Sequence, residues 1–251
     1  MRRSRRRLRT WLLAVLGLVL LAGIGWAIQW ATYARPPLPE AVDALESDAG
    51  VWVTDDPWLT FSLESRVPTT GFIFYPGGRV DPRAYASLMR AIAAEGYLVV
   101  VPEMPVNMAV FRPNVADEIM AYHPEIEHWV IGGHSVGGAM AAQYTANHPD
   151  VIDGLAIWAS YPPNRADLSG LEIPVVSIYG SRERRVNDTS VGARKPLLPE
   201  DTRYVRIEGG DHHQFGSYAV DSDERLAVIS RESQHAQMLA ATLPILEAAS
   251  Q

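Results

Sequence analysis

The chain of 251 residues contains no cysteine. Disulfide bonds, thiolate nucleophiles and zinc sites built on thiolates are therefore excluded. Lysine is almost absent as well: Lys195 stands against 21 arginines, a bias that favours a bacterial origin from a GC-rich genome. The sequence also shows no metal-ligand spacing, dinucleotide-binding fingerprint or phosphate-binding loop, so we expect neither a metal nor a cofactor.

Negative charge dominates the chain once its first residues are set aside. The net charge is −7 overall, but residues 2–9 carry six arginines and no acid. The remaining residues hold 16 basic against 29 acidic side chains, a net charge of −13. A domain with this balance is poorly suited to neutralise phosphates, so nucleic acid is not an expected partner. Nothing in the sequence points to an obligate protein partner.

An apolar run follows the arginines, from Trp11 to Ala31. At ~1.5 Å per residue it is long enough to cross a ~30 Å hydrocarbon core as a helix. Cleaved signal peptides have shorter apolar cores, of ~7–15 residues, and the small-x-small site at 32–34 is a poor one. We therefore predict a basic cytoplasmic tail at 1–10 and a single transmembrane anchor at 11–31, with the rest of the chain on the extracytoplasmic side. A twin-arginine export signal is the alternative interpretation of the arginine cluster.

The remaining chain is expected to form a proline-rich linker with a short helical piece at 32–50, then one domain at 51–251. In the domain, continuous apolar segments typical of buried strands alternate with amphipathic stretches typical of helices, which predicts a mostly parallel sheet covered on both faces. The expected strands are 51–54, 58–63, 71–75, 98–102, 128–132, 154–159, 175–179 and 204–207. One helix is expected to begin after Asp81, and three more are expected to span about 115–122, 137–147 and 224–248.

The segment Gly133-His134-Ser135-Val136-Gly137 fits the pattern G-x-S-x-G. It follows a buried strand directly and opens a helix, which is the setting of a nucleophile elbow. Glycines are needed because the turn leaves no room for side chains on either side of the serine. We therefore expect Ser135 to be a nucleophile, held above the sheet edge at a helix N-terminus. A small-residue turn that only lets helix and strand pack closely is the competing interpretation.

A serine hydroxyl is a weak nucleophile and needs a general base. His212 and His213 lie in a glycine-marked loop after the last strand, where an α/β hydrolase delivers its histidine in the chain order serine, acid, histidine. The acid should follow the preceding strand, and Glu183 comes three residues after Gly180. Asp188 is the alternative acid. Glu183 could instead pair with its neighbouring arginines at the surface.

Acyl transfer also needs hydrogen-bond donors for the oxyanion, each worth ~3–4 kcal/mol of barrier. The backbone amide of Val136, directly after the serine, is the first candidate. The second should come from the loop after strand 71–75, where glycines allow a close approach of the backbone. Gly78 is the expected donor, with Gly77 or Arg79 as alternatives.

From about residue 70 to its end the chain resembles the α/β-hydrolase superfamily, and in particular a small bacterial branch related to dienelactone hydrolase-like proteins. The resemblance is carried by FYPGG-x-VDP-x-AY, VVPEMPVNMAVF, GGHSVGG and IEGGDHHQFGSY. It implies an α/β-hydrolase fold, with an eight-stranded, mostly parallel sheet flanked by helices, here preceded by the transmembrane helix. It also implies the triad Ser135, Glu183 and His212. Two departures are the glutamate at the acid position and the absence of the nucleophilic cysteine of true dienelactone hydrolases.

Only about fifteen residues separate strands 154–159 and 175–179, where many lipases and epoxide hydrolases insert a lid domain. We therefore expect an open, uncapped site without a cap domain. Apolar side chains that could line it, although each could equally belong to the core, are Met104, Met108, Phe111 and Tyr161. The expected function is hydrolysis of a small carboxylic ester or thioester through an acyl-enzyme. An acyltransferase or peptidase on the same triad and a catalytically inactive binding protein are the alternatives.

Overall fold

The computed structural model describes residues 2–48, 50–220 and 226–251. The chain forms two compact units, Met1–Tyr33 and Ala34–Gln251. Helix α1 (Arg2–Thr32) makes up the first unit. Its segment Trp11–Trp30 has a mean hydropathy of 2.4 and is not buried by any other part of the chain. By length and composition this helix can cross a membrane, and a signal sequence would have the same features.

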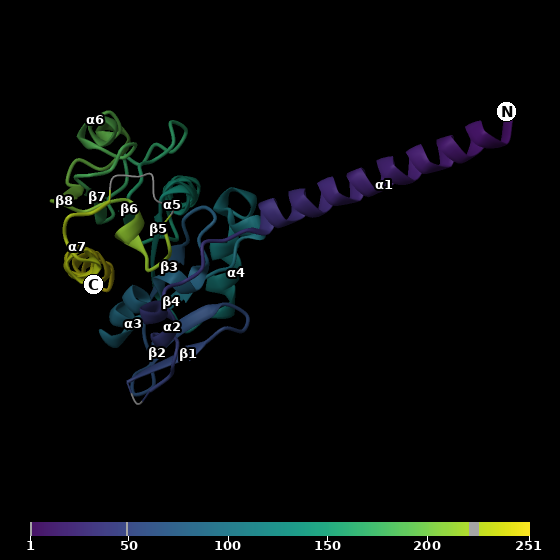
Figure 1. Cartoon of the computed structure of the whole chain (residues 1–251). Coiled ribbons are helices and arrows are strands. Elements are labelled where there is room, and N and C mark those ends of the chain that lie inside the picture. Colours follow the sequence, from purple (N-terminus) through teal and green to yellow (C-terminus); the bar gives the residue numbers. More distant parts are fainter. Residues whose placement is uncertain (1, 49, 221–225) are drawn as a thin grey trace. The chain divides into compact units, whose positions relative to one another are not determined.

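The second unit is built on one eight-stranded sheet (Figure 1). In their order across the sheet, the strands are β1 (Val51–Thr54), β2 (Leu59–Leu63), β4 (Leu98–Val101), β3 (Thr70–Tyr75), β5 (His128–His134), β6 (Gly154–Trp158), β7 (Val175–Gly180) and β8 (Arg203–Ile207). β1 and β2 form an antiparallel hairpin, β2 is also antiparallel to β4, and all other neighbours are parallel. The predicted fold class is confirmed, and each strand lies within two residues of its predicted bounds.

Alternating side chains of the strands pack on opposite layers of helices. Phe72 and Phe74 of β3 belong to a hydrophobic cluster that includes residues of α3 (Ala86–Ala94) and α7 (Arg231–Ala249). Ile73 and Tyr75 belong to a second cluster, with residues of α4 (Val115–Tyr122) and α5 (Val136–Asn147). The sheet is therefore covered on both faces, as its continuous apolar strands predict.

The terminal helix begins later than the predicted range 224–248. Residues 224 and 225 lie outside the described residues, and residues 226–230 are not helical. The amides of Ala227 and Val228 instead hydrogen-bond to Asp211 Oδ2 (3.0 Å) and to a carbonyl of the loop after β8 (2.9 Å). The side chain of Ser230 then caps the first turn of α7. A tertiary contact thus overrides the helical pattern of these residues.

The segment expected to be a linker, 32–50, is part of the second compact unit from Ala34 onward. It contains the expected short helix, α2 (Pro39–Asp43), whose Ala41 is fully buried. Arg35 forms a β-bridge with Val80, and its amide donates to the carbonyl of Arg79 at 2.7 Å. These contacts hold Arg35 against the loop that follows β3, at the carboxyl edge of the parallel strands.

Candidate active site

Ser135 occupies a strained turn between β5 and α5. Its φ and ψ are 54° and −119°, a conformation that a residue with a side chain rarely adopts and that clusters at functional sites. The glycines around it are required by close backbone contacts. A Cβ on Gly137 would lie 2.1 Å from the carbonyl oxygen of Tyr75, and one on Gly133 would lie 2.5 Å from the carbonyl carbon of Gly137. The backbone therefore makes the tight strand-to-helix turn that a nucleophile elbow requires.

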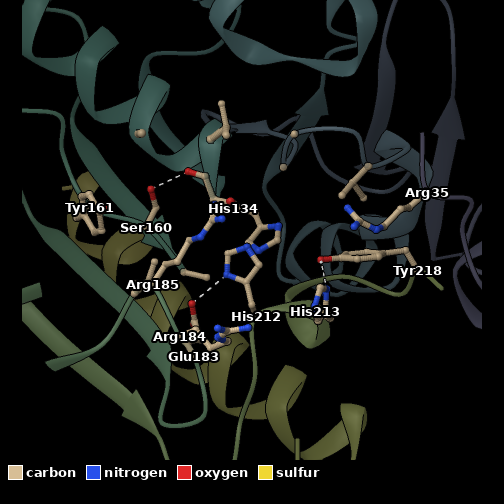
Figure 2. Close-up of a pocket in the computed structure, with 18 residues that line it drawn as sticks. Arg35, His134, Ser160, Tyr161, Glu183, Arg184, Arg185, His212, His213 and Tyr218 are labelled. Atoms are coloured by element: carbon tan, nitrogen blue, oxygen red, sulfur yellow. Dashed lines mark hydrogen bonds and ion pairs between the residues drawn. The ribbon is translucent and has the colours of Figure 1, made fainter. Parts of the chain in front are cut away.

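Glu183 and His212 meet beside this turn. Glu183 Oε2 lies 2.9 Å from His212 Nδ1 (Figure 2). Glu183 Oε1 accepts the amide of Gly180 at 2.9 Å. The side chain of Glu183 is 1 % exposed, so β7 and the His212 loop hold it firmly. Because a carboxylate only accepts hydrogen bonds, His212 carries its proton on Nδ1, which leaves Nε2 as a proton acceptor. Ser135, Glu183 and His212 line one cavity of about 630 Å³.

The alternative base, His213, also lines the cavity, but it and the alternative acid contact other side chains. His213 is buried, and its Nδ1 lies 3.5 Å from the hydroxyl of Tyr218. Asp188 begins the short helix α6 (Asp188–Gly192), accepts the hydroxyl of Tyr179 at 2.8 Å and pairs with Arg206 at 3.2 Å. Of the two histidines and the two acids weighed from the sequence, the structure thus brings together His212 and Glu183.

The loop after β3 distinguishes between the three oxyanion candidates. The amide of Gly77 donates to the hydroxyl of Tyr85 at 2.9 Å, and the amide of Arg79 donates to the carbonyl of Asn107 at 2.7 Å. In the described part of the chain, no acceptor is recorded for the amide of Gly78. The amide of Val136 opens α5, where a helix has no internal acceptor to offer. Gly78 and Val136 both line the cavity, so these two amides remain available to an oxyanion.

His134, the variable position of the elbow, is buried against the triad. Its Nδ1 lies 2.9 Å from the hydroxyl of Tyr85, and its ring centroid lies 4.6 Å from that of His212. Burial, together with the nearby charges of His212 and His213, lowers the pKa of His134 well below its usual value. A neutral His134 places no positive charge beside the imidazolium that His212 would become. The sequence offered no signal for this role beyond the residue's place in the motif.

Two further residues that the sequence did not single out hold the His212 loop. The buried carboxylate of Asp211 accepts the amides of His213 (2.9 Å), Gln214 (2.8 Å) and Ala227 (3.0 Å). Gln234 of α7 is fully buried, accepts the amide of Asp211 at 3.1 Å and donates to its carbonyl at 2.9 Å. The His212 loop is therefore fixed by contacts of its own residue Asp211 and of Gln234 in helix α7.

The predicted apolar pocket differs from the cavity that the structure contains. Of its four expected residues, Tyr161 lines the cavity. Met104 is buried in the core, Phe111 is 64 % exposed, and Met108 contacts Gly78 from outside the lining. These three residues lie in the segment after β4. This segment packs against the loop after β3, and the three side chains do not line the cavity. The lining includes instead three side chains that the prediction lacked, those of Arg35, Arg184 and Arg185.

The connection between β6 and β7 is short and irregular. Residues 159–174, which connect β6 to β7, contain neither a helix nor a strand. The predicted uncapped architecture is confirmed for this connection. Within the described residues, no group of three or more histidine, aspartate or glutamate side chains is arranged to hold a metal ion.

An eight-stranded sheet of this order, with a nucleophile elbow after β5 and an acid and a histidine after later strands, defines a hydrolase of the α/β type. The profile of the alpha/beta hydrolase family matches residues 71–236, and the chain belongs to this family. No curated protein matches the chain.

Two solved structures share the fold. One, from Klebsiella pneumoniae subsp. pneumoniae, carries the provisional name dienelactone hydrolase; it is 14 % identical, with a TM-score of 0.58, covering 75 % of this chain and 91 % of that one. The other is MGS-MChE2, an alpha/beta hydrolase enzyme from a lagoon-sediment metagenome of Mar Chica, Morocco. It is 16 % identical, with a TM-score of 0.54, covering 66 % of this chain and 90 % of that one. At these identities the two structures show the fold alone.

Proposed function

We propose that the protein is a serine hydrolase that cleaves carboxylic esters or thioesters with a triad of Ser135, Glu183 and His212. The observation that carries the proposal is the 2.9 Å contact between Glu183 Oε2 and His212 Nδ1 in the cavity that Ser135 also lines. The fold and the family support hydrolysis as the general reaction class. The turn at Ser135 and the contact between Glu183 and His212 support the roles proposed for the three residues.

The reaction would run in two halves. His212 Nε2 takes the proton of the Ser135 hydroxyl as the oxygen attacks the ester carbonyl, and the amides of Gly78 and Val136 stabilise the oxyanion. The carbon–oxygen bond to the alcohol breaks, and His212 returns the proton to the leaving alcohol. A water molecule, deprotonated by the same histidine, then hydrolyses the acyl-enzyme and frees the acid and Ser135.

A fluorophosphonate probe tests the nucleophile because it reacts with activated serines. The full chain in a non-ionic detergent should be labelled at Ser135, and Ser135→Ala should abolish both labelling and ester hydrolysis. Ser169→Ala is the matched control, since Ser169 is an exposed serine that bonds Asp167 outside the cavity. Labelling that survives Ser135→Ala would contradict the assignment.

We further propose that α1 anchors the protein in a membrane, with its arginines on the cytoplasmic side and the hydrolase unit across the membrane. The apolar segment Trp11–Trp30 and the preceding arginines support this orientation. Full-length protein should stay with membranes through a carbonate wash, and protease added to spheroplasts should digest the hydrolase unit. Release of uncleaved chain by carbonate would refute the anchor, and recovery of a shortened, soluble chain would identify a cleaved signal.

A further inference from the structure

Positive charge gathers in the cavity of an otherwise acidic unit. Arg35, Arg184 and Arg185 line it, although the chain without residues 2–9 has a net charge of −13. Among the lining residues the one carboxylate is that of Glu183, whose two oxygens already bond Gly180 and His212. Within the described part of the chain, no ion pair involves any of the three arginines. Their charges therefore face the cavity without a counterion from these residues.

Arg35 is the most constrained of the three. Its backbone is held by hydrogen bonds with the loop after β3, and its Nε is buried without a hydrogen-bond partner. Removing a guanidinium nitrogen from water is costly unless an acceptor replaces the water. Arg184 and Arg185 are exposed and follow Glu183 in the chain. In Figure 2 Arg35 lies on the Tyr218 side of the two histidines, His134 and His212, while Arg184 and Arg185 lie on the Glu183 side.

We propose that the cavity binds an anionic group of the ester substrate, a carboxylate or a phosphate, with Arg35 as its main contact. The proposal rests on the serine hydrolase function proposed above and names its substrate class. A guanidinium offers a planar fork of donors that matches both anions, and desolvation strengthens the interaction. The exposed Arg184 and Arg185 add attraction at the cavity mouth and draw anions from solution.

A matched pair of esters tests this preference. Mono-p-nitrophenyl glutarate carries a carboxylate on its acyl chain, and p-nitrophenyl valerate has the same chain length without a charge. We expect kcat/KM of the full chain in non-ionic detergent to favour the anionic ester by about 10- to 100-fold. Arg35→Gln should remove most of this preference, measured as the ratio of kcat/KM for the two esters, and Arg35→Lys should retain part of it.

Arg203→Gln is the matched control. Arg203 is an exposed arginine of β8 outside the cavity lining, so the variant loses the same charge without touching the site. It should leave the preference unchanged. An absence of preference in the wild type, or a preference that survives both Arg35→Gln and the double variant Arg184→Gln/Arg185→Gln, would overturn the anion site.

A binding measurement separates this proposal from the hydrolase function. Ser135→Ala, which cannot turn over, is titrated calorimetrically with glutarate and with inorganic phosphate, with and without Arg35→Gln. Arg35-dependent binding without any ester hydrolysis by the wild type would keep the anion site and refute the serine hydrolase. Ester hydrolysis with neither an anion preference nor Arg35-dependent binding would keep the serine hydrolase and refute the anion site.

The anion could belong to a soluble ester or to a lipid headgroup. Arg35 comes three positions in the chain after the last residue of α1, the helix proposed above as a membrane anchor. Fatty-acid release from phosphatidylglycerol vesicles is therefore compared with release from phosphatidylcholine vesicles. An Arg35-dependent preference for phosphatidylglycerol identifies a lipid source, and one confined to the glutarate ester identifies a soluble source. If neither ester nor lipid shows an Arg35-dependent preference, the anion site is refuted.

Discussion

Replacing Glu183 by glutamine exchanges one oxygen for an amino group in the contact that orients His212. Glu183 Oε1 accepts the amide of Gly180 at 2.9 Å, and Oε2 faces His212 Nδ1 at the same distance. In the variant, the amide oxygen has to stay on Gly180, because the opposite rotamer would place two donors against each other at a buried site. The amino group then faces Nδ1 and donates to it.

This reversal changes the tautomer of His212. A ring nitrogen that accepts a hydrogen bond carries no proton, so the proton moves to Nε2, the atom that must receive the hydrogen of Ser135. Removal of the acid in a triad of this kind, with geometry intact, costs about 10⁴ in kcat. We expect Glu183→Gln to lower kcat/KM by ~10³-fold or more, equivalent to at least ~4 kcal/mol of transition-state stabilisation.

The assay compares kcat/KM for a p-nitrophenyl ester between the wild type, Glu183→Gln and the control Asp188→Asn. Asp188 contacts Tyr179 and Arg206 and should cost less than tenfold. Circular dichroism and thermal unfolding establish that both variants are folded. A loss below tenfold for Glu183→Gln, or a larger loss for Asp188→Asn, would refute the tautomer argument and move the acid to Asp188.

Three further predictions concern stability. A Cβ on Gly137 would lie 2.1 Å from a backbone oxygen, so Gly137→Ala should lower the free energy of unfolding by about 3 kcal/mol or more. The control is Gly170→Ala, because a Cβ there would meet no atom within 4 Å; it should change the free energy of unfolding by less than ~0.5 kcal/mol. Urea titrations measure both values. Asp211→Asn turns a donor toward the amide of Ala227 and should destabilise by ~1–3 kcal/mol; an unchanged unfolding midpoint would contradict this. Burial lowers the pKa of His235 from 6.5 to about 4. As the pH falls from 6.5 to 4, the histidine is therefore protonated in the unfolded chain before it is protonated in the folded one. The free energy of unfolding should decline over this range by up to ~3 kcal/mol. His235→Gln should flatten that decline, and an equally steep decline in the variant would refute the linkage.

The fold could be predicted because the residues of each strand show a recognisable local sequence pattern. Segments such as 98–101 are continuous, β-branched and fully buried, and glycine or proline marks their ends. The two boundaries that differ depend on distant contacts. Residues 226–230 have a helical pattern, but their amides bond to the loop after β8. The segment from Ala34 onward looks like a linker, yet it packs against residues 79–81 and 217.

The three residues proposed as a triad could be selected from the sequence for the same reason. Ser135, Glu183 and His212 each follow a strand closely, and parallel strands bring their carboxyl ends to one edge of the sheet. Gly78 was the expected oxyanion donor, but the sequence left Gly77 and Arg79 open, because the choice depends on where the amides of Gly77 and Arg79 find acceptors. No spacing rule in the sequence encodes the hydroxyl of Tyr85 or the carbonyl that takes these bonds.

The sequence does not reveal that three arginines line the cavity. Next to Glu183, Arg184 and Arg185 suggest a surface ion pair, but the buried carboxylate turns toward His212 and leaves both guanidinium groups unpaired among the described residues. An anionic group of the substrate would supply the counterion that these guanidinium groups lack among the described residues. The charge of the cavity therefore favours anionic esters over neutral esters of the same chain length.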